Sequence, residues 1–177
     1  IHDFGGFPRA LYEMQYPAPG DEALARHIVT LLARSRAEVR LDWGLDHGTW
    51  SVLHHLCPAA DLPVVQVSID SRLSPEEHVV LGQALSSLRD EGVLVMGSGN
   101  ITHNLRHAMS VMGKGNVPTP PWAITFDESI ARALEDHNLR YLSEALDGAE
   151  GRLSHPTPDH YFPVLYVAGA TGATDPV

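Results

Sequence analysis

Apolar and polar residues alternate along this chain with two different periods, which predict helices and strands in turn. From Asp21 to about Ala37 the apolar residues recur every three or four positions, which predicts an amphipathic helix. Leu62–Ile69 is instead rich in β-branched residues and predicts a buried strand. Val39 and Leu41 alternate with polar residues, which predicts a short strand between these two elements.

A helix with a strong start signal follows the strand at Leu62–Ile69. The segment Ser74-Pro75-Glu76-Glu77 has the spacing of a capping box and places proline in the first turn. We expect this helix to run to about Glu91 and to stop at Gly92, before a second buried strand that begins at Val93–Met96. Strand, helix and strand form a βαβ unit, so the two strands should be parallel, with ligands off their carboxyl ends.

The later part of the chain predicts helices rather than strands. Asp127–Leu146 is expected to form one long helix, and an apolar helix is expected to begin near Asp159, after a segment with two prolines. Residues 1–20 hold glycines and prolines among aromatic residues, which predicts an ordered but irregular segment. We therefore expect an α/β fold and a single domain over residues 1–177.

The composition is that of an ordinary globular protein. Of the 177 residues, 44% are apolar and 19% are charged. The formal net charge of −10 argues against nucleic acid and anionic membranes as partners, because both need a basic surface. No apolar run approaches the roughly 20 residues of a membrane helix, and no leader pattern is present, so we expect a cytoplasmic protein.

Histidine and carboxylate are the side chains that could bind a metal here. Cys57 is the sole cysteine, which excludes an intrachain disulfide and a thiolate cluster, whereas 11 histidines are many for this length. We expect solvated positions for the histidines that lie on helices with charged or polar neighbours: His27, His54, His55, His78 and His137.

The first segment with candidate chemistry is Ser98–Leu105 (SGNITHNL), which follows the second strand. Glycine there allows the backbone to turn sharply and to approach a ligand, and His103 titrates near the working range for proton transfer. The alternative is a loop that starts a helix, with Asn100 as the cap and His103 as a polar residue of the first turn.

The second segment is Leu45–Trp50 (LDHGTW). Asp46 or a backbone carbonyl could orient His47, and Gly48 could allow substrate to come close. The alternative is a turn in which Asp46 caps a helix and His47 is exposed.

The third segment is His155–Tyr161 (HPTPDHY), in which two prolines restrict the backbone before the final helix. Such a restricted approach would fix the direction of His160 as a metal ligand. The alternative is that the prolines only make the start of the final helix rigid, with both His155 and His160 in solvent.

Four segments together resemble the LigB-type extradiol ring-cleavage dioxygenases, in the 4,5-DOPA dioxygenase branch. They occur in the family's order and at about its spacing, and the similarity spans essentially the whole chain. They are Ile1–Pro8 with Tyr16–Gly20 after it, Leu45–Trp50, Ser98–Leu105 and Pro156–Tyr161.

The resemblance implies a three-layer α/β/α fold with a mixed, largely parallel central sheet. It implies a catechol-type substrate, O2 and one divalent metal, which is Fe(II) in active members, with Zn(II) as an alternative. By the same match His160 is a metal ligand, and His103 is the acid/base residue near the metal and a further candidate ligand. His47 contacts substrate or dioxygen, and we expect Asn100 to bind substrate with it.

The chain departs from the family pattern in its ligands. The family carries two more ligand histidines, which we expect upstream of Ile1, and it continues past Val177. The chain is therefore expected to be an internal fragment that lacks N- and C-terminal parts of the fold and is itself inactive. Two other functions stay open: a catalytically inactive LigB-like metal-binding or signalling protein, and a zinc hydrolase on the same scaffold.

Overall fold

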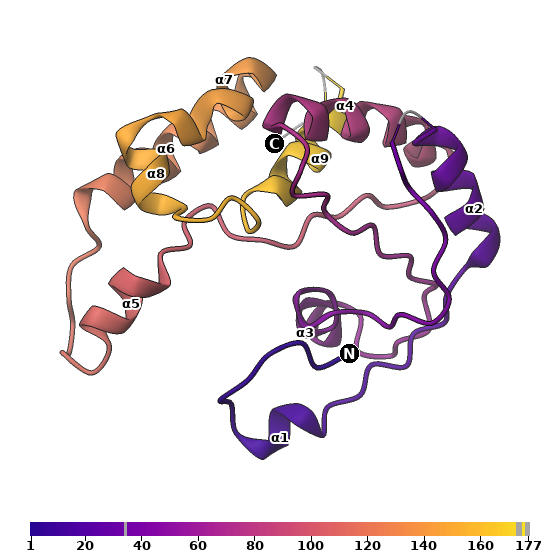
Figure 1. The fold of residues 1–177 in the computed structure, drawn as a ribbon, viewed down its shortest axis with the longest axis horizontal. Coiled ribbons are helices and arrows are strands. Elements are labelled where there is room, and N and C mark those ends of the chain that lie inside the picture. Colours follow the sequence, from indigo (N-terminus) through magenta and orange to yellow (C-terminus); the bar gives the residue numbers. More distant parts are fainter. Residues whose placement is uncertain (34, 173–174, 176–177) are drawn as a thin grey trace. The chain divides into compact units, whose positions relative to one another are not determined.

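The computed structural model describes residues 1–33, 35–172 and 175, and the chain divides into two compact units. Unit 1 comprises Ile1–Ser68 and unit 2 comprises Ile69–Val177. Every regular element of the described residues is helical (Figure 1). The single catalytic domain expected over residues 1–177 stays a prediction.

In unit 1, two helices begin at aspartate caps. The described elements are α1 (Arg9–Tyr12), α2 (Glu22–Leu31) and α3 (His47–Leu56). The Asp21 carboxylate accepts from the amide of Leu24 at 2.9 Å, and the Asp46 carboxylate accepts from that of Thr49 at 2.8 Å. Each carboxylate satisfies one of the amides that a helix start leaves without a partner. The buried apolar residues of this unit are Ile28, Leu32, Trp50 and Leu53.

Unit 2 holds most of the buried core. Its elements are α4 (Pro75–Leu85), η1 (Ser86–Glu91), α5 (Leu105–Val111), α6 (Pro121–Glu135), α7 (Leu139–Glu144), η2 (Ala145–Asp147), α8 (Ala149–Ser154) and α9 (Phe162–Ala170). The core cluster draws its largest side chains from α6, α7 and the start of α9: Phe126, Ile130, Leu142, Tyr161, Phe162 and Leu165. No helix of the described residues is long and apolar enough to cross a membrane.

Helices α4 and α9 lie against each other (Figure 1). A Cβ atom added at Gly82 would overlap the backbone of Tyr166, so the two helices approach at a distance that only glycine permits. On α4 the ring of His78 is fully buried and stacks on Phe162, with ring centroids 4.1 Å apart. The expectation that His78 is solvated is therefore wrong.

The local helix signals of α4 are confirmed, whereas the boundaries of a later helix are wrong. Ser74 and Glu77 form the predicted capping box, and Gly92 ends the helical segment in the left-handed region at φ +79°. The helix expected over Asp127–Leu146 begins earlier, at Pro121, and stops at Glu135. It is interrupted because His137 adopts a positive φ of 49° and the side chain of Asn138 then caps α7.

The central sheet expected from the pattern and from the resemblance is contradicted, because residues 1–33, 35–172 and 175 contain no strand. The division between the units lies between Ser68 and Ile69. All of the first expected strand except Ile69 is therefore in unit 1, whereas Val93–Met96 is in unit 2. Instead of being buried, Leu94 is 80% exposed. β-Branched residues favour a pleated, half-buried surface, but a strand also needs hydrogen bonds to a neighbouring strand.

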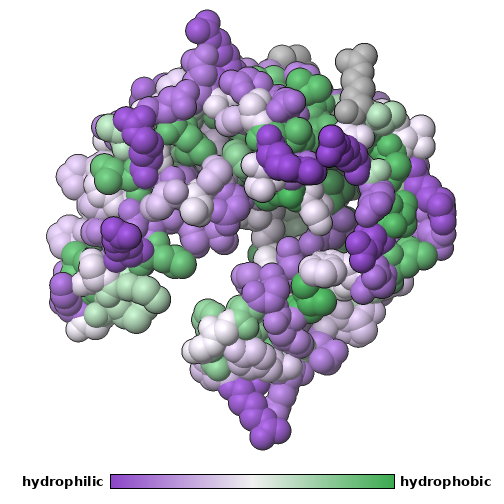
Figure 2. Space-filling view, viewed as in Figure 1, coloured by the Kyte–Doolittle hydropathy of each residue, from purple (hydrophilic) through white to green (hydrophobic). Residues whose placement is uncertain are grey.

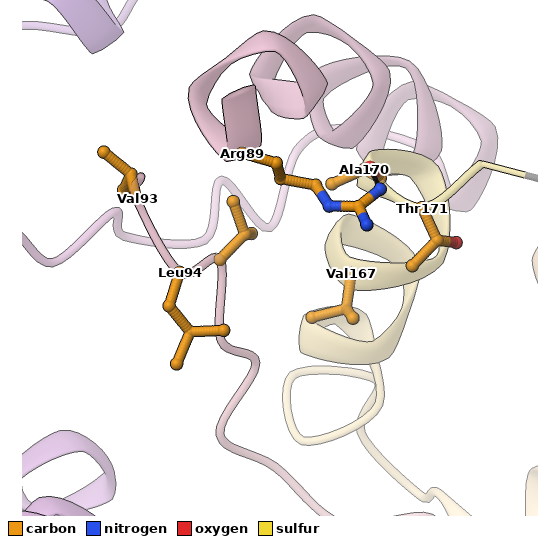
Figure 3. Close-up of a pocket in the computed structure, with 7 residues that line it drawn as sticks. Arg89, Val93, Leu94, Val167, Ala170 and Thr171 are labelled. Carbon is orange, nitrogen blue, oxygen red and sulfur yellow. Dashed lines mark hydrogen bonds between the residues drawn. The ribbon is translucent and has the colours of Figure 1, made fainter. Parts of the chain in front are cut away.

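The segment after η1 leaves apolar surface in contact with solvent. It borders a groove of about 270 Å³, which is lined by Arg89, Val93, Leu94, Val95, Val167, Ala170 and Thr171 (Figure 3). The guanidinium group of Arg89 lines this groove and donates to the carbonyl oxygen of Ala170 at 3.1 Å. Exposed apolar side chains also occur elsewhere, as the green areas of Figure 2 show. None of the residues that line the groove is a candidate site residue.

Candidate functional site

The glycine-rich segment that follows Met96 lies directly against the His-Pro-Thr-Pro segment in unit 2. The amide of Asn100 donates to the carbonyl of His160 at 2.9 Å, and the amide of His103 donates to the carbonyl of Ser154 at 2.8 Å. The side-chain amide of Asn104 donates to the carbonyl of Leu153 at 2.7 Å and its oxygen caps α5. These bonds hold together residues that lie 49 or more positions apart in the sequence.

Two glycines make this contact sterically feasible. A Cβ atom at Gly99 would overlap the carbonyl oxygen of His160, and one at Gly97 would lie 2.6 Å from the carbonyl oxygen of Pro163. We predicted that glycine here serves a sharp turn or the approach of a ligand. The structure shows instead that it serves the approach of another backbone segment.

This contact brings His103 and His160 face to face. Their ring centroids are 3.5 Å apart and their planes differ by 19°. Nε2 of His160 lies 3.6 Å from a carboxylate oxygen of Asp159. The side chain of His160 is 35% exposed and His103 is half-buried, so the pair remains open to a small molecule.

Burial and neighbouring charge favour a neutral ring on His103. Burial is the largest cause that lowers the pKa of His103, and positive charge on His160 lowers it further, against a smaller opposing effect of Asp159. Burial raises the pKa of Asp159, but a hydrogen bond from Thr157 and the two histidines outweigh it and leave that pKa below its ordinary value. Near neutral pH the ring of His103 is therefore neutral and the carboxylate of Asp159 is ionised.

His155 is a member of this site that the sequence did not reveal. The alternative of a rigid helix start placed His155 in solvent, but it is only 5% exposed. Its Nε2 bonds to the carbonyl oxygen of Ile101 at 2.8 Å, whereas Nδ1 is buried without a partner among the described residues. Burial lowers the pKa of His155, and His103 and His160 add to that shift. The one available signal was Pro156, which restricts the backbone of the preceding residue.

His47 lies in unit 1, at the first position of α3. One carboxylate oxygen of Asp3 lies 3.0 Å from its backbone nitrogen and 2.8 Å from its Nδ1. Asp46 caps α3, as the alternative interpretation predicted, and its carboxylate also accepts from the side-chain amide of Gln66. The group that orients His47 is therefore Asp3, and the expectation that Asp46 or a carbonyl does so is wrong.

Comparison with known proteins identifies the family of this arrangement. The family model described as the catalytic LigB subunit of aromatic ring-opening dioxygenase matches residues 1–176. The chain belongs to the LigB family.

Relatives within the LigB family confirm the resemblance to the DOPA-dioxygenase branch. The chain is 47% identical to a 4,5-DOPA dioxygenase extradiol of Escherichia coli K12, over 100% of this chain and 66% of that protein. It is 41% identical to a protein of the same name from Beta vulgaris, over 97% of this chain and 64% of that protein. A crystal structure of an uncharacterized E. coli K12 protein matches with a TM-score of 0.83 at 43% identity, over 94% of this chain and 68% of that one. The chain thus spans about two thirds of the length of these LigB relatives.

The LigB metal centre is not complete within the described residues. No group of three or more His, Cys, Asp or Glu side chains among them could hold one ion. A facial ligand set takes three protein donors and leaves positions open for substrate and O2. His103, His160 and Asp159 have suitable donor types, but they are not arranged as such a group and do not form a whole metal site. The role of His160 as one ligand stays a prediction.

Proposed function

We propose that this chain carries catalytic residues of an extradiol dioxygenase that cleaves a catechol-type ring with O2 at a non-haem Fe(II) centre. Membership of the LigB family and the names of its relatives support ring cleavage. The observation that carries the proposal is the stacked pair of His103 and His160, which places a neutral imidazole beside the proposed ligand.

In this proposal His103 moves protons. Its lowered pKa keeps the ring unprotonated near neutral pH, so it can accept the proton of a catechol hydroxyl and return it at a later step. The backbone hydrogen bond from His103 to Ser154 fixes the residue while the ring stays accessible. Positioned acid/base groups of this kind contribute about 10²–10⁴-fold to a rate.

Two further residues are proposed to contact substrate. The backbone N–H of Asn100 donates to the carbonyl oxygen of His160. Its side chain is exposed and can offer both a donor and an acceptor to a hydroxyl group. His47 is held by Asp3 while its side chain is 45% exposed, and it can hydrogen-bond substrate or dioxygen as charge develops.

The metal supplies the chemistry that these side chains cannot. Fe(II) at the site would supply redox chemistry toward a catechol and O2, which Zn(II) would not, because zinc has no accessible redox change. His160 is proposed as one ligand, because its backbone is held in place. Its carbonyl accepts a hydrogen bond from Asn100, and two prolines restrict the chain just before it.

Oxygen consumption tests the proposal directly. The complete protein that carries these residues would be loaded with Fe(II) or with Zn(II), and a catechol would be added in an oxygen electrode. We expect one O2 consumed for each ring-opened product with Fe(II) and none with Zn(II). Absence of uptake with Fe(II) would favour a LigB-like binding or signalling protein, and metal-dependent hydrolysis with Zn(II) would favour the hydrolase.

A further inference from the structure

The start of α3 is covered by the first residues of the chain, which bring a carboxylate to His47. The indole nitrogen of Trp50 donates to the carbonyl of Ile1 at 3.0 Å, and the ring of Phe4 contacts those of Trp50 and His47. Phe4 meets His47 edge to face, with centroids 5.5 Å apart. Because Asp3 lies between these two anchored residues, its side chain has a defined position over the helix start.

The two contacts of Asp3 determine which ring nitrogen of His47 carries the proton. Oδ1 accepts the backbone N–H of His47 and lies 2.8 Å from Nδ1. A carboxylate can only accept, so Nδ1 must be the donor. Burial raises the pKa of Asp3, but the hydrogen bonds from His47 outweigh burial and leave it below the ordinary value, which keeps the group ionised near neutral pH.

We propose that Asp3 is a positioning residue that holds His47 in the Nδ1–H tautomer and so presents the unprotonated Nε2 to substrate. Nε2 has no partner among the described residues, and the His47 side chain is 45% exposed. This inference rests on the proposed function, because it assigns His47 the part of a hydrogen-bond acceptor toward a catechol hydroxyl.

The carboxylate also stabilises the charge that forms if the hydroxyl proton moves to His47. The O–H bond breaks, its electron pair stays on the substrate oxygen, and the proton forms a bond to Nε2. The resulting imidazolium is balanced by the Asp3 carboxylate at Nδ1 and can then donate from Nε2 to the oxygen that gained charge. His47 thus acts as acceptor first and as donor afterwards, which a ring with its proton on Nε2 could not do.

The tautomer can be measured without substrate or metal. Long-range ¹H–¹⁵N spectra of the ¹⁵N-histidine-labelled chain at about pH 8.5, two units above the ordinary histidine pKa, distinguish protonated from unprotonated ring nitrogens. The resonances of His47 are those lost in His47→Gln. We expect the proton mainly on Nδ1 in the wild type and mainly on Nε2 in Asp3→Ala, as in free histidine. Asp42→Ala is the matched control, since Asp42 is an exposed carboxylate of the same unit that pairs with Arg40.

A wild-type His47 with its proton mainly on Nε2 would overturn the inference, whatever the activity of the protein. In the complete protein we expect Asp3→Ala to lower kcat about 10–100-fold, the range for loss of a group that orients a functional histidine. An unchanged kcat beside an altered tautomer would overturn the positioning role. If no catechol is cleaved by the wild type, the proposed function fails, while the tautomer measurement still decides whether Asp3 orients His47.

Discussion

The imidazole rings of His103 and His160 stack at a centroid distance of 3.5 Å, although the two residues lie 57 positions apart in the sequence. Two features of the backbone produce this contact. Gly97 and Gly99 let the segment before His103 lie against the segment that contains His160, and amide hydrogen bonds then fix both. The pair is therefore a property of the fold of unit 2 and not of two mobile side chains.

The first prediction concerns the close approach at Gly99. Gly99→Ala should destabilise the protein by about 1–3 kcal/mol, because the new methyl group would meet a backbone oxygen that cannot move aside. It should also separate His103 from His160. Gly20→Ala is the control, since a Cβ there has nothing within 4 Å. Chemical denaturation measures both variants, and equal stability of the two would mean that the close approach is not required.

The second prediction concerns the pH dependence of stability. The pKa of His155 is lowered by burial in the folded chain, while an unfolded histidine titrates near 6.5. Below that value the unfolded chain takes up a proton that folded His155 does not, so the free energy of unfolding falls as pH drops through the range between the unfolded and the folded pKa. Each pKa unit of depression corresponds to about 1.4 kcal/mol.

His155→Gln should reduce this pH dependence, because glutamine does not titrate and its amide can still donate to the carbonyl of Ile101. Thermal unfolding between about pH 7.5 and 5.5 would show a smaller fall in Tm than in the wild type. His55→Gln, at an exposed position of α3, should leave the slope unchanged. An identical slope in all three proteins would show that His155 is not the group responsible.

The third prediction is that the 177-residue chain alone binds Fe(II) weakly and consumes no O2 with a catechol. A facial site needs three ligands around one ion, and the described residues contain no group of three His, Cys, Asp or Glu side chains that could hold one. Equilibrium dialysis with Fe(II) and an oxygen electrode would check both statements. Robust turnover by this chain would contradict our interpretation of its ligands.

Features that depend on neighbouring residues were predictable from the sequence. The capping box at Ser74–Glu77, the stop at Gly92 and the cap at Asp46 each involve atoms within four residues of one another. Whether the extended segments pair into a sheet could not be predicted in the same way. The sequence shows that Leu62–Ile69 and Val93–Met96 favour extended backbone. A sheet also needs a ladder of backbone hydrogen bonds between neighbouring strands, and the described residues contain no strand.

The same distinction holds for the candidate site. The motifs identified His47, His103 and His160 as candidates, and the stacking of the last two agrees with a shared site. The burial of His155 and the contact of Asp3 with His47 were missed, because each depends on a partner 44 or more residues away. No periodicity in the sequence reports such a contact.

The most direct test compares His103→Phe and His160→Ala in the complete protein, with ring-cleavage rates and metal content measured on the same samples. Phenylalanine keeps the stacked ring but cannot carry a proton. We expect His103→Phe to lose about 10²–10⁴-fold in rate with its metal retained, and His160→Ala to lose metal and activity together. If His103→Phe loses its metal as fully as His160→Ala, His103 is a ligand and the division of roles in this pair is wrong.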